Sequence, residues 1–381
     1  MKIGIDIRAL DAPFRTGVGE YIVDLLEAVF KQPPRHDYYL FSNAFHPRPL
    51  PFLRQANVHM VQTRYPNKLL TAATAIFQTP KIDRLITRKT GIKLDIFFSP
   101  NLNVTALSKD VKHVLMIHDL SFIFFPNFYT PKQRLWHWLA KLKKQANEAA
   151  KITVPSENTK RDVINYLGVA AEKITVLYPG IPTSLTKSDI APLVPVRGNY
   201  SIPEKFILFV GSVEPRKNIL SLITAYEQAR MKLIFPYSLI IVGALGKDSQ
   251  IIRNKIDASP YRSSIQLLGF ITANEKKSLY RKAGLVVYAS WYEGFGFPII
   301  EAAHAGIPII TSNRSSMPEV AGKAAHLVNP HYPDEITDSL VDILNNPKRA
   351  SKAVAWGFAR ARDFSWEKTA AAYLNTIEQI K

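Results

Sequence analysis

The sequence of 381 residues contains no cysteine. A disulfide framework, a thiolate nucleophile and a cysteine-ligated zinc site are therefore excluded together. Long apolar runs are lacking too: the longest uncharged stretch, Leu233 to Gly246, contains Pro236 and is too short to span a bilayer. The first residues, Met1 to Asp6, carry charges and precede no long apolar run, so they predict a buried strand rather than a signal peptide. We expect a cytoplasmic protein whose chemistry relies on carboxylates, imidazoles, amines and hydroxyls.

Acidic residues are scarce relative to basic ones. The chain has 49 Lys and Arg against 31 Asp and Glu, which gives a net charge of +18 and a pI near 9.8. The first 180 residues hold 25 of the basic and 14 of the acidic residues, so much of the excess lies there. This charge calls for an anionic partner: nucleic acid, an anionic membrane face or phosphorylated small molecules.

The length and the apolar pattern predict two α/β domains in tandem. A chain of 381 residues is too long for one compact core of ordinary size, and its hydrophobic content of 47% is that of a globular protein. Short apolar runs alternate with segments of helical period, which is typical of parallel sheets covered on both faces. The Pro- and Gly-rich stretch from Tyr178 to Pro203 is the predicted linker.

The predicted strands form one set before this linker and one after it. They are Lys2 to Arg8, Tyr38 to Ser42, Asn57 to Val61, Ile96 to Phe98, Lys112 to Ile117, Lys151 to Val154 and Lys173 to Leu177, then Phe206 to Gly211, Leu239 to Gly243, Ile265 to Leu268, Leu285 to Tyr288, Pro308 to Thr311 and Ala325 to Val328. Ligands of such sheets bind at the carboxyl ends of the strands, so the residues that follow each strand are the candidates for a site.

Two candidates lie in the first half. Thr16-Gly17-Val18-Gly19 follows the first strand and precedes a helix expected to start near Glu20, where glycines let backbone N–H groups approach a phosphate. Ile22 stands where a dinucleotide fingerprint needs its third glycine, so a nicotinamide enzyme is disfavoured, and a plain tight turn remains the alternative. His118 ends a strand beside Asp119 and could bind a hydroxyl, although a histidine without a role is about as common there.

Two adjacent cations follow the first strand of the second half. Gly211 ends that strand, and Arg216 and Lys217 come shortly after it at the expected start of a helix. They could add charge-assisted hydrogen bonds to a diphosphate. An exposed basic helix start is the plainer interpretation, but cations oppose the helix dipole at that end.

The sharpest pattern runs from Glu293 to Glu301. Pro298 fits the first position of a helix, which would place Glu301 in its first turn and leave Gly294, Phe295 and Gly296 in the preceding loop. A carboxylate accepts hydrogen bonds from vicinal hydroxyls, as on a sugar or a ribose. Compensation of the helix dipole would explain Glu301 but not the glycine loop.

These residues resemble those of retaining glycosyltransferase family 4, and in particular its bacterial mannosyltransferases. Glu293 to Glu301 is similar to the family's Glu-x7-Glu motif, Arg216 and Lys217 to its donor-phosphate pair, and Gly17 and Gly19 to its N-terminal glycine loop. Ala303 to Pro308 and Met317 to Val320 match as well. The resemblance spans nearly the whole chain and is most specific from Phe206 to Gly322.

The resemblance implies a GT-B fold: two Rossmann-like, doubly wound domains that face each other across a cleft. Residues 1–185 would bind the acceptor, residues 200–364 the nucleotide sugar, and 365–381 would form a helix that packs back toward the N-terminal domain. Arg216 and Lys217 would hold the diphosphate, Glu301 the ribose hydroxyls, and Glu293 and His118 the donor sugar. The resemblance implies transfer with retention of configuration, without a metal or other cofactor.

The resemblance leaves the donor sugar and the acceptor open. A GDP-mannose donor is common among similar bacterial sequences, so we expect mannosyl transfer to a saccharide or lipid-linked saccharide in cell-surface polysaccharide synthesis. The basic, Trp-containing segment Pro131 to Ala150, expected to form one helix, suggests peripheral contact with the inner face of an anionic membrane. An ordinary amphipathic helix with a solvated basic face is as good an interpretation.

Two rival functions remain at this stage. A GT-B-fold nucleotide-sugar epimerase would need no acceptor, and the Glu-x7-Glu segment argues against it. A basic nucleic-acid-binding protein would account for the net charge, but the sequence shows no stripe of basic and aromatic residues typical of nucleic-acid readout.

Overall fold

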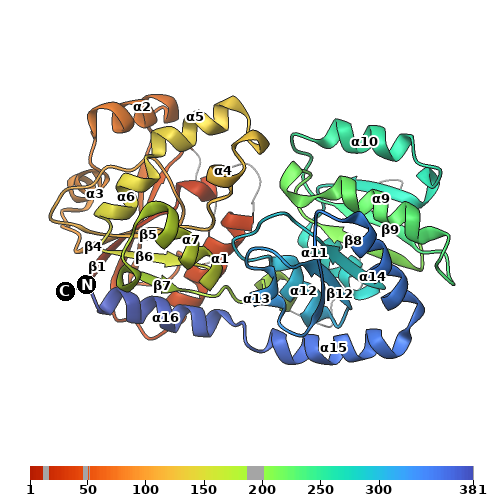
Figure 1. Ribbon diagram of the computed structural model, residues 1–381. Coiled ribbons are helices and arrows are strands. Elements are labelled where there is room, and N and C mark those ends of the chain that lie inside the picture. The colour runs from red at the N-terminus through yellow and green to blue at the C-terminus, as the bar shows by residue number, and fades with distance from the viewer. Residues whose placement is uncertain (12–16, 46–49, 51, 187–200, 381) are drawn as a thin grey trace. The chain divides into compact units, whose positions relative to one another are not determined.

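A computed structural model describes residues 1–11, 17–45, 50, 52–186 and 201–380 (Figure 1). The chain divides into two compact units: Met1–Gly180 with Ser365–Lys381, called unit 1, and Ile181–Phe364, called unit 2. Among the described residues, no helix is long and apolar enough to cross a membrane.

The described part of unit 1 contains a seven-stranded sheet, all of it parallel, in the order β3-β2-β1-β4-β5-β6-β7. Its strands are β1 (Lys2–Asp6), β2 (Asp37–Asn43), β3 (Val58–Thr63), β4 (Ile96–Ser99), β5 (Lys112–Met116), β6 (Lys151–Val154) and β7 (Ile174–Val176). Its α-helices are α1 (Gly17–Phe30), α2 (Asn67–Phe77), α3 (Ile82–Thr90), α4 (Ser121–Phe124), α5 (Pro131–Ala140), α6 (Leu142–Glu148), α7 (Glu157–Leu167) and α16 (Trp366–Glu378).

Helices cover both faces of this sheet, as the near-continuous apolar strands predict. Successive side chains of a strand point to opposite faces, and β4 shows this with two neighbours. Phe97 packs into a core with Ile86 of α3, whereas Phe98 packs against Tyr373 of α16 with ring centroids 4.9 Å apart. Helix α16 also packs against α1, where the Trp366 and Tyr21 rings lie 5.4 Å apart.

The described part of unit 2 contains a six-stranded parallel sheet in the order β10-β9-β8-β11-β12-β13. Its strands are β8 (Phe206–Val210), β9 (Ser238–Val242), β10 (Ile265–Gly269), β11 (Leu285–Tyr288), β12 (Ile309–Ser312) and β13 (Ala325–Val328). Its α-helices are α8 (Thr183–Thr186), α9 (Ile219–Arg230), α10 (Ser249–Asp257), α11 (Ala273–Lys282), α12 (Phe297–Ala305), α13 (Met317–Ala321), α14 (Pro333–Asn345) and α15 (Pro347–Ala361).

The predicted fold class is confirmed: each unit is a doubly wound α/β layer structure with one fully parallel sheet. Every predicted strand is present, with ends that differ by at most two residues. In unit 1 the strand order reverses between β1 and β4, and in unit 2 between β8 and β11. Ligands of open α/β sheets bind at such a switch point, beyond the carboxyl ends of the two strands.

Two expectations about helices are wrong. The helix expected to start near Glu20 begins at Gly17, so Gly17 and Gly19 lie in the first turn of α1 rather than in a loop, and Thr16 lies outside the described residues. The single helix expected over Pro131 to Ala150 is broken at Lys141, which has φ +49°. The Gln145 amide donates to the Ala140 carbonyl oxygen at 2.6 Å, which satisfies a helix-end acceptor at the break.

Candidate active site

The predicted site residues of unit 2 gather beyond the two strands at its switch point. The loop after β8 carries Arg216 and Lys217 in a 3-10 turn, Pro215–Lys217. The loop after β11 carries Glu293, and α12 follows it. The chain thus brings together side chains that lie more than 70 residues apart in sequence, at the place where a doubly wound sheet binds its ligand.

Glu293 lies at the centre of a buried cluster. One carboxylate oxygen accepts from Arg216 Nη1 at 2.6 Å, and the other accepts from Lys217 Nζ at 2.6 Å. The Tyr288 hydroxyl donates to the latter oxygen at 2.8 Å and accepts from Lys217 Nζ at 2.6 Å. Both predicted cations therefore share one carboxylate, and sequence reasoning did not identify Tyr288 as the third partner.

Burial and charge together determine the protonation of this cluster. Burial alone would raise the pKa of Glu293, but the charges of Arg216 and Lys217 outweigh it and lower this pKa to about 2. Burial, with Arg216 beside it, lowers the pKa of Lys217. Burial and the Glu293 charge raise the pKa of Tyr288 well above 10. Glu293 is thus a carboxylate at neutral pH: it can accept hydrogen bonds and stabilise positive charge, but it cannot act as a general acid.

The loop after β8 is tied to the loop after β11 by further hydrogen bonds. Arg216 Nη1 also donates to the Tyr292 carbonyl oxygen, and Arg216 Nη2 to Glu214, each at 2.9 Å. Asn218 has φ +58° and its amide donates to the carbonyl oxygens of Ala289 and Pro330. Asn and Asp tolerate this left-handed conformation better than most residues. These bonds fix the direction in which the two cations point.

The glycine loop is held by two serines that the sequence analysis did not place in the site. Ser315 accepts from the Glu293 backbone N–H at 3.2 Å and donates to the Glu293 carbonyl oxygen. Ser316 donates to the carbonyl oxygens of Glu293 and Phe295 at 2.9 and 3.0 Å. Ser315 itself has φ +55°, a strained conformation of a kind that clusters at functional sites.

The other predicted donor-binding residues of unit 2, in the glycine loop and after β8, have different structural roles. The Phe295 side chain is buried between Phe297 and Phe364, so only its backbone could meet a ligand. Gly296 has φ +100° and precedes α12, a conformation that favours glycine. The Gly211 N–H donates to the Val242 carbonyl oxygen at 2.9 Å and extends the sheet. Gly294 lies between Glu293 and Phe295 in the same loop.

The position of Glu301 differs from the expectation. Helix α12 begins at Phe297, so Pro298 is its second residue and Glu301 its fifth, beyond the first turn. Its carboxylate is 2% exposed and accepts from Tyr280 OH at 2.6 Å and from Lys276 Nζ at 2.9 Å, both on α11. Helix-dipole compensation at the first turn therefore does not explain this residue, and neither of its partners was identified from sequence.

His118 of unit 1 is half-buried and neutral at neutral pH. Its Nε2 lies 2.9 Å from the Pro100 carbonyl oxygen, which can only accept, so this nitrogen carries the proton and Nδ1 is the acceptor. Burial lowers the pKa of His118. The neighbouring Asp119 carboxylate accepts from the backbone N–H and the hydroxyl of Ser121.

Gly17 begins α1, and a larger residue would fit at this position. A Cβ built at Gly17 meets no described heavy atom within 4 Å, and its φ is not in the left-handed region. The fold alone therefore does not account for glycine here, which leaves room for a ligand group near the helix N-terminus. Gly19 is buried in the same turn. The predicted residues thus form two sets, with Gly17, Gly19 and His118 in unit 1 and the others in unit 2.

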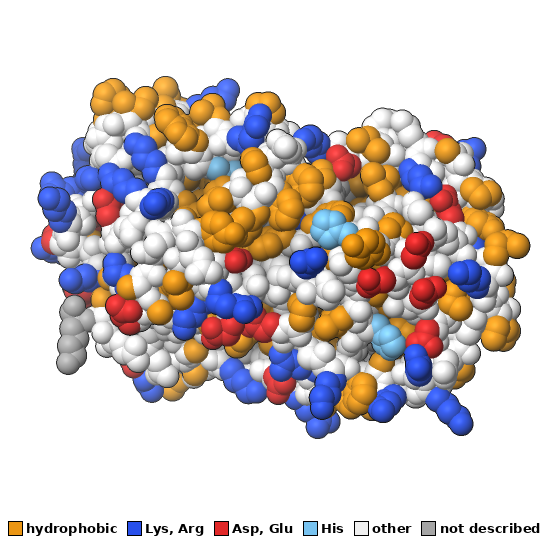
Figure 2. All heavy atoms as spheres, viewed as in Figure 1, with side chains coloured by type: hydrophobic (Ala, Val, Ile, Leu, Met, Phe, Trp, Pro, Cys, Tyr) orange, Lys and Arg blue, Asp and Glu red, His pale blue; other side chains and the backbone are white. Residues whose placement is uncertain are grey.

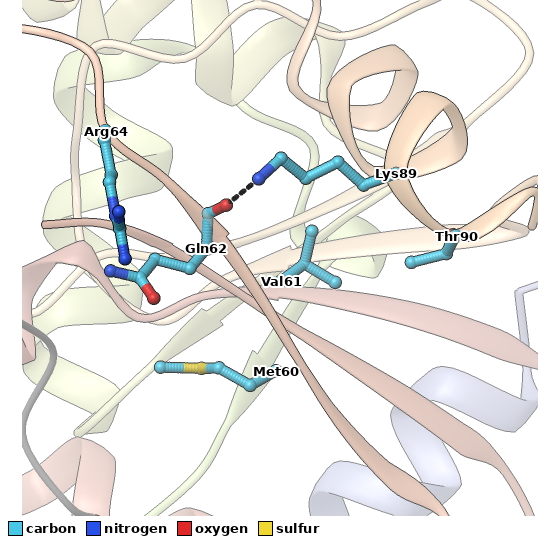
Figure 3. Close-up of a pocket in the computed structure, with 6 residues that line it drawn as sticks. All are labelled: Met60, Val61, Gln62, Arg64, Lys89 and Thr90. Carbon is cyan, nitrogen blue, oxygen red and sulfur yellow. Dashed lines mark hydrogen bonds between the residues drawn. The ribbon is translucent and has the colours of Figure 1, made fainter. Parts of the chain in front are cut away.

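Unit 1 also has a hollow that the sequence analysis did not anticipate. It measures about 470 Å³ and lies between the edge strand β3 and the end of α3. Figure 3 shows Gln62 on β3 and Arg64 just beyond the end of that strand. The Lys89 side chain extends from α3 and donates to the Gln62 carbonyl oxygen. None of its lining residues is a predicted site residue.

The fold and the switch-point cluster define a GT-B glycosyltransferase architecture, and comparisons with known proteins agree. A family model for Glycosyltransferase Family 4 matches residues 15–185, and one for Glycosyl transferases group 1 matches residues 198–357. The chain is 30% identical over 268 residues to the O-antigen chain mannosyltransferase B of Escherichia coli, which covers 70% of each protein. The chain therefore belongs to glycosyltransferase family 4 and is a glycosyltransferase, which disfavours both rival functions.

Solved structures show the same fold. Sucrose-phosphate synthase from Thermosynechococcus elongatus has a TM-score of 0.75 at 17% identity, with 99% of this chain and 98% of that one covered. Anabaena HepE, solved with UDP and glucose, has a TM-score of 0.70 at 17% identity and full coverage of both chains. At these identities the likeness concerns the fold alone.

Proposed function

We propose that the protein transfers a hexose, with mannose from GDP-mannose as the first candidate, from a nucleotide sugar to a saccharide or lipid-linked saccharide. The buried cluster of Arg216, Lys217 and Glu293 at the switch point of unit 2 carries the proposal. The O-antigen mannosyltransferase relative supports mannose as the sugar and cell-surface polysaccharide synthesis as the process. Unit 1 would then bind the acceptor.

The cations of the cluster suit a diphosphate. An arginine has five N–H donors and a lysine three, more than one carboxylate can accept. Arg216 and Lys217 can therefore bind phosphate oxygens while Glu293 still holds them in place. Such charge-assisted bonds stabilise the negative charge that develops on the leaving diphosphate.

The proposed transfer is a substitution at the anomeric carbon with retention of configuration. The acceptor oxygen forms the new glycosidic bond as the bond between carbon and phosphate oxygen breaks, and the acceptor proton passes to the leaving phosphate. Glu293, ionised near neutral pH, would stabilise the positive charge of the oxocarbenium-like state and orient a sugar hydroxyl. Neutral His118 would offer Nδ1 as an acceptor to another sugar hydroxyl.

Isothermal titration with GDP, UDP, ADP and dTDP tests the donor site. One nucleotide should bind in the micromolar range, and Glu301→Ala should weaken it roughly 5- to 150-fold, as expected for loss of a charged hydrogen-bond partner worth about 1 to 3 kcal/mol. Exposed Glu204 in the same unit supplies the matched control, and Glu204→Ala should bind as the wild type does.

A dideoxy analogue shows whether Glu301 acts through the ribose. The wild type should bind the 2′,3′-dideoxy form of the preferred nucleotide more weakly than the normal form. Glu301→Ala should bind both forms equally, because removing the carboxylate and removing the ribose hydroxyls abolish the same interaction. Additive losses would assign Glu301 a purely structural role. Transfer is then assayed with the matching sugar donor, and NMR of the product reports retention or inversion.

A further inference from the structure

Helices α2 and α5 lie side by side at the surface of unit 1 (Figure 1). Lys141, just after α5, donates to the Ala75 carbonyl oxygen of α2 at 3.0 Å, and Ala75 and Ala140 belong to one core cluster. The two helices therefore form a joined surface, which we call the α2–α5 surface.

Large apolar side chains are exposed on this surface. The most exposed on each helix are Phe77, at 72%, and Trp138, at 70%. The full set is Leu69, Ile76 and Phe77 on α2, and Leu135 and Trp138 on α5. Leaving so many apolar side chains in water is unfavourable, and a concentration of them marks an interaction site.

The same surface is free of acidic residues in sequence. Neither segment 64–82, which contains α2, nor segment 120–147, which contains α5, includes a single Asp or Glu. Their basic residues are Arg64, Lys68, Lys81, Lys132, Arg134, Lys141, Lys143 and Lys144. Figure 2 shows hydrophobic side chains with basic ones among them over the part of unit 1 where Figure 1 draws these helices.

A hollow of about 490 Å³ lies on the α5 side of this surface. Its charged lining is entirely basic, and Trp138 and Phe122 form part of its apolar wall; the basic lining residues are Arg134, Lys141, Lys143 and Lys144. Lys144 has only a loose ion pair, with Glu148 at 3.8 Å. Such a hollow suits a phosphodiester whose attached chains continue into an apolar medium.

We propose that the α2–α5 surface docks on an anionic phospholipid bilayer and that this hollow receives a phosphodiester headgroup. Exposed aliphatic and aromatic side chains bury themselves at the boundary between headgroups and acyl chains, and tryptophan favours this depth. The lysines and arginines beside them complement anionic headgroups. A nucleic acid would leave the aliphatic side chains in water. The proposal extends the expectation drawn from Pro131 to Ala150 by adding α2, and it does not depend on the identity of the donor.

Flotation of the whole protein with liposomes tests the proposal. It should float with vesicles of phosphatidylcholine and phosphatidylglycerol at a ratio of roughly 3:1, where the negative surface attracts basic side chains, and much less with phosphatidylcholine alone. Lys143→Gln with Lys144→Gln should weaken partitioning roughly 25-fold, about fivefold for each charge near the surface. The matched control is the same change at exposed Lys348 and Lys352 on α15, which should alter nothing.

A second pair of variants tests the apolar part. Ile76→Ser with Phe77→Ser should lower partitioning by at least about tenfold, since the buried apolar area drives insertion. Met231→Ser with Ile234→Ser is the control, because these side chains are as exposed but lie in unit 2. Unchanged melting temperature and nucleotide affinity in every variant separate this proposal from the donor site.

Three outcomes would overturn the proposal. Equal flotation with and without anionic lipid would refute the proposed recognition of anionic headgroups. Equal losses of partitioning in the test and control variants would show that the α2–α5 surface is not the docking surface. Self-association that disappears in the Ile76 and Phe77 variant, without flotation of the wild type, would make this face an interface between copies of the chain.

Discussion

Glu293→Gln should destabilise the protein markedly at neutral pH. The substitution keeps the size of the side chain and removes its charge, which leaves Lys217, 8% exposed, beside Arg216 without their shared carboxylate. The pKa of Glu293, lowered from 4.5 to about 2, corresponds to about 3 kcal/mol in favour of the ionised form in the folded state. Breaking a buried ion pair by removing one partner costs about 3 to 5 kcal/mol, so both approaches give a similar magnitude.

The pH dependence of this effect has a definite sign. Because the folded-state pKa of Glu293 is depressed, its stabilisation is fully present above about 4.5 and is lost as the pH falls toward about 2. The wild type should therefore lose its advantage over Glu293→Gln across this range, since protonation of the carboxyl mimics the substitution.

Urea denaturation followed by circular dichroism at about pH 7, 4 and 3 measures the effect across the titration range of Glu293. Glu204→Gln, at an exposed position of the same unit, is the control and should match the wild type at each pH. A Glu293→Gln variant as stable as this control at pH 7 would refute the reasoning. So would a loss of stability that stays constant as the pH is lowered through the titration range of Glu293.

Three further outcomes can be checked separately. NMR titration should give His118 a pKa below 6.5, because burial opposes its positive charge. The contribution of neutral His118 to the stability of the fold is therefore present above pH 6.5 and falls as the pH drops. A titration midpoint at or above 6.5 would contradict this. Gly180→Ala should destabilise unit 1 by about 1 to 3 kcal/mol, because the new Cβ would lie 2.3 Å from the Trp366 backbone nitrogen. Gly17→Ala should leave the stability unchanged or raise it by up to about 1 kcal/mol, because a Cβ there meets no described atom. Equal shifts of the melting temperature in the two variants would refute this comparison. Transfer activity should survive EDTA if cations of the chain alone hold the diphosphate, and restoration by Mg²⁺ after its loss would show a metal requirement.

The strands could be predicted because they are buried on both faces. A strand such as Phe206–Val210 is apolar at every position, so it stands out in sequence without any alternation, and its ends need only the neighbouring turn residues. The rule for ligand position directed the search to the loops after the strands, and the cations Arg216 and Lys217 and the glutamate of the glycine loop singled out the loops after β8 and β11. That these two loops meet at the switch point became clear only from the strand order of the sheet.

The helix errors have local physical causes. Glycine is a poor helix former, so Gly17 and Gly19 indicated a loop, yet they lie in the first turn of α1, which continues through a strongly apolar face that packs on the sheet. The break occurs where Lys141 adopts a left-handed conformation, and no glycine or proline at that position indicates it in the sequence. It is supported by the hydrogen bond from Lys141 Nζ to the Ala75 carbonyl oxygen of α2, a tertiary contact that the local sequence does not show.

The supporting residues of the site were missed for a related reason. Ser315 and Ser316 lie in the connection between β12 and α13, and Lys276 and Tyr280 lie on α11. Each reaches its glutamate only through the folding of separate strand–helix repeats, and none forms a motif of its own. The glutamates could be identified because their spacing is local, whereas the groups that hold them are distant in sequence.

The partners of the two glutamates suggest why their proposed roles are not interchangeable. A carboxylate offers about four acceptor positions. Glu293 uses three of them in the contacts described, with Arg216, Lys217 and Tyr288, whereas Glu301 uses two, with Lys276 and Tyr280. Glu301 therefore keeps capacity for the pair of hydroxyls of a ribose, and Glu293 for a single sugar hydroxyl. On this argument Glu293 would act in the proposed reaction mainly through charge, and Glu301 mainly through hydrogen-bond geometry.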